Sequence, residues 1–335
     1  MKQLRNHVVV ITGASSGFGR GAAEKFAREG ADLVLAARRG DVLAEVARTC
    51  RKHGVRVLAV ETDVSEREQV DALAERAIGE FGRMDIWVNN AGVATYGRFN
   101  DSPVDEHEQV IQTNLLGTLY GSRAALRQFR RQSRGTLINV ASFAGVASFP
   151  YGASYTASKH GIRGLDMALR QELLANHEHN IHVCTVSPTS MDTPFFEHAA
   201  NHTGKRVKPI PPVYDPHLVV DAIYDVARNP KDEVIVGRRG KVAGTMAQIS
   251  PRLVEKQMAK RTHKAMIEKS EPAPDSEGNL FVPMESGRSV RGGWKRSGLG
   301  RRLGAVLAVG GPAVLAWMLW NSAKNHAAAE RRSAA

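Results

Sequence analysis

The stretch His7-Val8-Val9-Val10-Ile11-Thr12-Gly13-Ala14-Ser15-Ser16-Gly17-Phe18-Gly19 decides the fold of this 335-residue chain. It begins with an apolar run rich in β-branched residues, which predicts a buried strand. Its three glycines let the backbone turn tightly and approach a phosphate closely, and the free amides of a following helix favour negative charge. A helical pattern from Arg20 to Arg28 supplies that helix. The stretch therefore predicts a strand, a phosphate-binding turn and a helix, although a glycine turn alone can also be only a turn.

The same alternation continues to about residue 240. Strands are predicted at 7–11, 32–36, 55–60, 85–88, 135–140, 181–187 and 233–236. Helices are predicted between them at 18–29, 40–53, 67–81, 104–133, 153–176 and 216–228. Strands that alternate with helices form a parallel sheet covered on both faces. The pattern predicts a Rossmann-type, doubly wound α/β fold, with residues 1–245 as a single catalytic domain.

Three residues downstream of the glycine turn have the chemistry to move a proton at an oxygen atom. Tyr155 and Lys159 are four apart, so on a helix they share one face. A phenol has a pKa of about 10, and a neighbouring ammonium favours the phenolate and lowers that pKa. The hydroxyl of Ser142 can hold the reacting oxygen. The set predicts general acid and base catalysis.

These residues and their spacing resemble the short-chain dehydrogenase/reductase family over residues 5 to about 240. The resemblance rests on five motifs in the order of the family: Thr12-Gly13-x3-Gly17-x-Gly19, Asn89-Asn90-Ala91-Gly92, Asn114, Ser142 and Tyr155-x3-Lys159. It implies an enzyme that transfers a hydride between a nicotinamide cofactor and a carbonyl or alcohol, acting on CH–OH donors.

The resemblance also implies a role for each residue of the site. Tyr155 would be the general acid or base, and Lys159 would lower its pKa and bind the nicotinamide ribose. Ser142 would orient the substrate oxygen, and Asn114 would hold a water in a proton relay. The cofactor would be bound by Gly13, Ser15, Ser16, Gly17, Phe18, Gly19, Arg38, Arg39, Asp63, Val64, Asn90, Ala91, Gly92, Tyr155, Lys159, Pro188 and Thr193. Thr189 stands where the family commonly has glycine, so the loop on the nicotinamide side is expected to differ.

The end of the second predicted strand indicates which cofactor is preferred. Dinucleotide folds that prefer NAD usually place an acidic residue there to accept from the ribose 2′-hydroxyl. This strand ends instead in Ala36-Ala37-Arg38-Arg39. A guanidinium group suits a 2′-phosphate, so NADP(H) is expected in preference to NAD(H).

Residues 189–215 interrupt the alternation and carry apolar side chains that include Met191, Phe195 and Phe196. The family places a substrate-covering loop here, and such a loop needs apolar residues to exclude water. The composition predicts a lipophilic substrate, and an ordinary irregular connection is the alternative. A protein that binds NADP as a regulatory or scaffold component, with catalysis secondary, is the alternative function.

The end of the chain departs from this pattern. Residues 246–270 are predicted as an amphipathic helical extension and 271–301 as a flexible basic linker. Residues 302–321 include an uncharged run from Leu303 to Trp320 that would reach about 27 Å as a helix, just enough for a bilayer core of about 30 Å. A membrane anchor is predicted, with a core helix or an oligomer contact as alternatives. The basic residues before this run would keep the catalytic domain cytoplasmic.

Charge and cysteine content exclude some classes of function. The net charge is +12, but residues 286–335 hold nine Lys and Arg against one acidic residue, Glu330. The basicity therefore belongs to a tail, and no nucleic-acid partner is expected. Cys50 and Cys184 are the only cysteines, which predicts no disulfide framework and no metal site. A homodimer or homotetramer is expected through the long helices 104–133 and 153–176.

Overall fold

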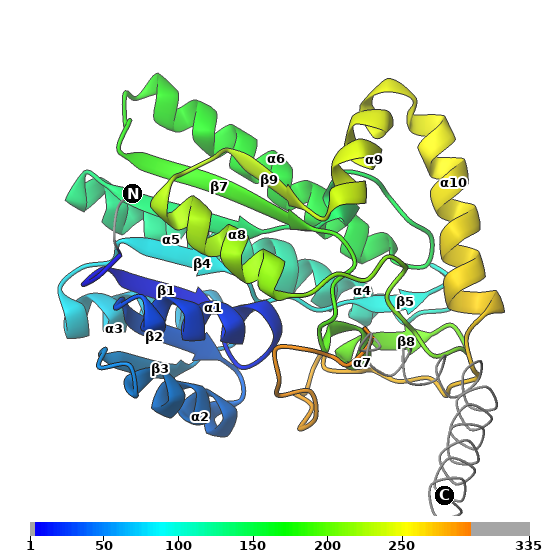
Figure 1. Ribbon diagram of the computed structural model, residues 1–335, viewed down its shortest axis with the longest axis horizontal. Helices are drawn as coiled ribbons and strands as arrows, with labels where there is room; N and C mark the ends of the chain where they lie inside the picture. The colour runs from blue at the N-terminus through cyan, green and yellow to red at the C-terminus, as the bar shows by residue number, and fades with distance from the viewer. Residues whose placement is uncertain (1–3, 296–335) are drawn as a thin grey trace, which may run out of the picture. The chain divides into compact units, whose positions relative to one another are not determined.

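A seven-stranded parallel sheet forms the centre of the computed structural model, which describes residues 4–295 (Figure 1). The strand order is β3-β2-β1-β4-β6-β7-β9. The strands are β1 (Val8–Thr12), β2 (Asp32–Ala37), β3 (Val57–Glu61), β4 (Ile86–Asn89), β6 (Gly135–Val140), β7 (Ile181–Pro188) and β9 (Glu233–Val236). Val10 pairs with Val34 of β2 on one side and with Trp87 of β4 on the other. The strand order reverses at β1, as it does in a Rossmann-type sheet, so the predicted fold class is confirmed.

Helices cover both faces of the sheet because successive side chains of a strand point to opposite faces. Val9 and Ile11 pack into one core with Phe26 and Ile223, whereas Val8 and Val10 pack into the other core with Phe129. The first face is covered by α1 (Gly17–Arg28), α2 (Gly40–Arg51) and α8 (His217–Arg228). The second face is covered by α3 (Arg67–Phe81), α5 (Gly117–Gln132) and α6 (Ala153–Ala175).

The long helix predicted at 104–133 is not uniformly α-helical. It consists of α4 (Val104–Ile111), the π-helical turn η1 (Gln112–Leu116) and α5. A π-helical turn inserts an extra residue into the helix and is frequent at functional sites. The turn carries Asn114, whose buried side chain has partners outside the helix.

Short elements that the sequence pattern does not predict lie in the loops after the strands. They are β5 (Thr95–Gly97), the 3-10 turn η2 (Phe143–Gly145), α7 (Phe195–His198) and β8 (Ala200–His202). β5 and β8 pair in parallel as a separate two-stranded sheet. Three or four residues are too few to show a hydrophobic period, so only the tertiary structure places them.

The compact unit of the described structure continues beyond residue 245, where the sequence predicts the end of the catalytic domain. Residues 1–294 form one compact unit, and this unit includes α9 (Arg238–Ile249), α10 (Pro251–His263) and the π-helical turn η3 (Lys264–Glu268). A flexible linker is predicted at 271–301, and within its described part the backbone of Ser276 pairs with the domain. Ser276 bridges to Asn201 of β8, since the edge of that short sheet leaves backbone groups to be satisfied.

The predicted membrane segment at 302–321 lies outside the described residues. Within residues 4–295, no helix is both long enough and apolar enough to cross a membrane.

Candidate active site

One cavity of about 360 Å³ lies at the carboxyl ends of the sheet strands, where an open α/β sheet binds its ligands. It brings together residues from the glycine turn, the end of β2, the loop after β4 and helix α6. Most of the predicted site residues line it: Gly13, Ser15, Ser16, Gly17, Phe18, Arg38, Arg39, Asp63, Val64, Asn90, Ala91, Gly92, Ser142, Tyr155, Lys159, Pro188 and Thr193. Gly19 and Asn114 do not line the cavity but lie directly behind residues that do.

The glycine turn is shaped by close backbone contacts. Gly13 has a φ of +65°, and a Cβ atom there would lie 2.8 Å from the Cα of Ala91. A Cβ atom on Gly19 would lie 2.2 Å from the carbonyl oxygen of Gly13. The side-chain amide of Asn90 donates to the carbonyl oxygens of Thr12, at 3.0 Å, and Gly13, at 3.2 Å. The turn and the start of α1 therefore leave space for a phosphate against backbone amides, which fits a dinucleotide.

Arg38 and Arg39 line the cavity at the end of β2. Arg39 Nη2 donates to Ser15 Oγ at 3.1 Å, and Arg38 lies 4.0 Å from the Asp63 carboxylate. Burial lowers the pKa of both guanidinium groups. Their other hydrogen bonds go to backbone carbonyl oxygens of residues 279–286, a contact that was not predicted from the sequence. Two positively charged guanidinium groups thus face the cavity, and the carboxylate of Asp63 lies at the limit of ion-pair distance from one of them. This excess of positive charge suits an anionic ligand.

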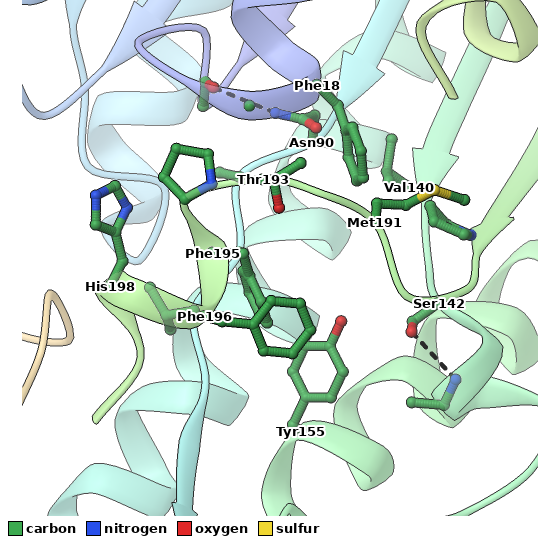
Figure 2. Close-up of a pocket in the computed structure, with 18 of the residues that line it drawn as sticks. Phe18, Asn90, Val140, Ser142, Tyr155, Met191, Thr193, Phe195, Phe196 and His198 are labelled. Carbon is green, nitrogen blue, oxygen red and sulfur yellow. Dashed lines mark hydrogen bonds between the residues drawn. The ribbon is translucent and has the colours of Figure 1, made fainter. Parts of the chain in front are cut away.

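Ser142 and Tyr155 meet at the other end of the cavity. Ser142 begins the η2 turn, and its Oγ accepts from the backbone N–H of Ala144 at 3.1 Å. Tyr155 is only 9% exposed, and its hydroxyl points toward Ser142 (Figure 2). Burial raises the pKa of Tyr155 to about 12, and a hydrogen bond to Ser142 acts in the opposite direction. The phenol is therefore protonated and available as an acid.

Lys159 lies one helical turn after Tyr155 on α6, as predicted. Its Nζ donates to the carbonyl oxygen of Val140 at 2.9 Å and lies 5.7 Å from the centre of the Tyr155 ring. Burial lowers the pKa of Lys159 to about 8. The expected lowering of the Tyr155 pKa by Lys159 is not found in this structure. Burial is the largest cause of both shifts, because it disfavours the charged form of each group.

Asn114 holds the loop after β4 against α6. Its side chain accepts from the backbone N–H of Val93 at 2.8 Å and donates to the Val93 carbonyl oxygen at 2.9 Å. It also donates to Ser158 Oγ at 3.1 Å. A Cβ atom on Gly92 would lie 3.4 Å from Asn114 Oδ1 and 3.7 Å from Lys159 Nζ, so the two groups are close neighbours. The role of Asn114 in a proton relay stays a prediction.

Aromatic and apolar side chains surround Tyr155. The ring centres of Phe195 and Phe149 lie 5.5 Å and 6.3 Å from that of Tyr155. The sequence indicated these side chains, but it did not show that α10 and η3 contribute Met258 and Met266 to the same cavity. The only sequence signal for that contribution was the apolar stripe of the 246–270 helix.

Comparisons with known proteins agree with this geometry. The family described as "short chain dehydrogenase" matches residues 7–203. "Uncharacterized oxidoreductase YxnA" of Bacillus subtilis is 33% identical over 304 residues, which cover 89% of this chain and 84% of the relative. An uncharacterized oxidoreductase of Staphylococcus saprophyticus is 37% identical over 206 residues, covering 62% of this chain and 82% of that protein. Because the match to YxnA covers 89% of this chain, it must extend past residue 294.

Two solved structures share the fold. A short chain dehydrogenase/reductase from Burkholderia phymatum, crystallised in complex with NAD, has a TM-score of 0.70 and 27% identity. The similarity covers 76% of this chain and 97% of that one. An alcohol dehydrogenase from the archaeon Thermococcus sibiricus, complexed with 5-hydroxy-NADP, has a TM-score of 0.60 and 28% identity, covering 69% and 96% of the two chains.

Proposed function

This chain is an oxidoreductase of the short-chain dehydrogenase family, and we propose that it transfers a hydride between NADP(H) and a lipophilic carbonyl compound or secondary alcohol. The observation that carries the proposal is a single cavity with two guanidinium groups, of Arg38 and Arg39, at one end. At its other end, Tyr155 and Ser142 stand among aromatic side chains.

The residues of the chain supply the proton chemistry. A bound nicotinamide supplies or accepts the hydride. Tyr155 donates its hydroxyl proton to the substrate oxygen during reduction and takes a proton back during oxidation. Ser142 donates a hydrogen bond to the same oxygen and stabilises the charge that develops on it. Lys159, when charged, stabilises the phenolate that Tyr155 leaves behind.

The preference for NADP(H) depends on residues of this chain, because the two solved relatives were crystallised with different cofactors, NAD and 5-hydroxy-NADP. Three observations support it. β2 ends without an acidic residue, and the two arginines that follow it line the cavity. Arg39 also donates a hydrogen bond to Ser15 in the glycine turn. A 2′-phosphate placed there would meet two planar donors.

We expect Arg38→Ala and Arg39→Ala each to weaken NADPH binding by about 10- to 100-fold, the value of a charged hydrogen bond. NADH, which lacks the 2′-phosphate, should lose only the smaller part of its affinity that depends on the hydrogen bonds from these arginines to residues 279–286. Titration of both nucleotides by fluorescence checks this, with Arg48→Ala, an exposed change on α2, as the control. Equal affinity of the unaltered enzyme for NADH and NADPH would exclude the preference.

The lipophilic substrate is supported by the side chains around Tyr155, which include Phe149, Phe195, Phe196 and Met266. Burial of each CH₂ group of a substrate against such a surface contributes about 0.8 kcal/mol. NADPH consumption should therefore increase along a series of aldehydes and ketones of growing chain length. Turnover of only small polar sugars would rule out this substrate class.

We further propose that the segment 302–321 attaches the enzyme to membranes, as its composition suggests. The full chain should sediment with lipid vesicles, and Leu307→Arg with Val314→Arg should release it, because a charge in a bilayer core is costly.

A homo-oligomer through α4, α5 and α6 is proposed as well. It is supported by exposed apolar residues on these helices, Val104, Leu119, Met167 and Leu174, and light scattering gives its mass.

A further inference from the structure

Residues 276–294, here called the strap and drawn in orange in Figure 1, contribute three lining residues to the cavity. The strap contains no helix or strand, and it lies beyond the residues that match the family, 7–203. It begins at the bridge between Ser276 and Asn201 and ends at Trp294. Its path is fixed by backbone hydrogen bonds and by three glycines.

The first part of the strap is held by the two arginines at the end of β2. Arg38 Nη1 donates to the carbonyl oxygens of Leu280, at 3.0 Å, and Phe281, at 3.2 Å, and its Nη2 donates to that of Asn279. Arg39 Nη1 donates to two further carbonyl oxygens of the strap, of residues 284 and 286, at 3.0 and 2.9 Å. The strap therefore fixes both guanidinium groups without neutralising their charge, since a carbonyl oxygen is uncharged.

The second part of the strap is held by the glycine turn and by the loop after β7. The backbone N–H of Gly17, in the glycine turn, donates to the carbonyl oxygen of Ser289 at 3.0 Å. The indole Nε1 of Trp294 donates to the carbonyl oxygen of Thr193 at 2.9 Å, and its backbone N–H donates to Asp192 Oδ1 at 2.7 Å. The strap thus spans from the adenosine side of the proposed cofactor site to the loop after β7.

Three glycines allow the strap to lie this close. A Cβ atom on Gly278 would lie 2.3 Å from the carbonyl oxygen of His198, and one on Gly287 would lie 2.0 Å from His198 Nε2. A Cβ atom on Gly292 would lie 2.3 Å from the carbonyl oxygen of Thr193. Gly278 and Gly287 also have positive φ values, of +56° and +64°, which glycine adopts without strain. The sequence of the strap therefore suits this position on the domain.

The inner side of the strap is part of the cavity wall. Asn279, Pro283 and Met284 line the same cavity as Tyr155 and the glycine turn. Leu280 is fully buried and packs in the apolar cluster that contains Tyr155. In contrast, Val282 points to solvent and is 73% exposed. The strap has one face for the cavity and one for water, as a cover does.

We infer that the strap completes the cofactor site of this enzyme, holding Arg38 and Arg39 in place and retaining the bound dinucleotide. The inference rests on the proposed function, because it requires a nucleotide in this cavity. A seated strap closes the path above the adenosine half, so the nucleotide leaves only when the strap lifts. Release of the cofactor is then governed by the strap contacts as well as by contacts to the nucleotide.

Gly278→Ala and Gly292→Ala in the full chain test this inference at the two ends of the strap. Each substitution adds a methyl group against backbone atoms of the domain and so destabilises the contact between the strap and the domain. A cost of 1.4 kcal/mol shifts the equilibrium between the seated and the lifted strap tenfold. Stopped-flow fluorescence should show NADPH and NADH both dissociating at least about 10-fold faster from each variant. Gly79→Ala on α3, where an added Cβ atom meets nothing within 4 Å, is the matched control and should leave both rates unchanged.

Unchanged or slower dissociation from both strap variants, with normal circular dichroism, would overturn the inference. Equal binding of NADH and NADPH by the unaltered chain, with faster release from the variants, would overturn only the NADP preference. A chain that binds neither nucleotide would overturn the proposed function and the strap inference together.

Discussion

Tyr155→Phe is expected to lower kcat by about 10²- to 10⁴-fold, the usual contribution of a positioned general acid or base. The change removes the hydroxyl group but keeps the ring, which packs against Phe149 and Phe195. Nucleotide binding and the free energy of unfolding should therefore change little. Steady-state NADPH consumption with a carbonyl substrate, together with a nucleotide titration, measures the two effects separately.

Tyr224→Phe is the matched control for this prediction. Tyr224 lies on α8, and its hydroxyl donates to Glu29 at 3.1 Å, away from the cavity. Its loss should leave kcat within about twofold, as expected for a change outside the site. A Tyr155→Phe enzyme with nearly full activity would show that another group supplies the proton.

Lys159→Met is expected to abolish most activity and yet stabilise the protein when no cofactor is bound. The ammonium is 4% exposed, and its only hydrogen-bond partner among the described residues is the carbonyl oxygen of Val140. Because burial lowers its pKa from 10.5 to about 8, the charged form costs stability. Replacement by an apolar side chain of similar length should raise the free energy of unfolding by about 1–3 kcal/mol near pH 7, after the lost hydrogen bond is counted.

The pH dependence of this gain has a definite sign. Between pH 8 and 10.5 the unfolded chain keeps the Lys159 proton while the folded chain has lost it. The stability of the unaltered protein therefore rises with pH across this window, and the advantage of Lys159→Met shrinks. Urea unfolding at pH 7 and pH 9.5 measures the change, with the exposed Lys52→Met as control. An advantage that stays constant or grows with pH would show that the buried charge of Lys159 is not what destabilises the protein.

Much of the fold could be predicted from the sequence because the sheet strands are buried on both faces. Runs such as Val8-Val9-Val10-Ile11 and Asp32-Leu33-Val34-Leu35 are almost continuously apolar and are bounded by turns, so the seven sheet strands begin within two residues of their predicted positions. The glycine turn was likewise predicted from residues that are adjacent in the sequence. Each of these features depends on residues that are neighbours in the chain.

The elements that were not predicted have no such local signal. β5 and β8 are three residues long and pair across about a hundred residues of chain. The π-helical turn at Gln112–Leu116 is explained by the partners of Asn114 in another loop and helix, not by its own sequence. The pKa of Tyr155 was also misjudged, since the spacing of Tyr155 and Lys159 carries no information on how deeply they are buried.

By itself, the sequence determined the family and the parallel sheet, and it led to the proposal for which residues meet the cofactor and the substrate oxygen. These follow from local patterns and from the spacing of reactive side chains. Only the tertiary structure showed that Arg38 and Arg39 hold the strap and that α10 helps to enclose the substrate end of the cavity. The physical reason is that the strap is bound through backbone carbonyl oxygens. Every residue carries such an oxygen, so the residues that provide it leave no mark in the sequence.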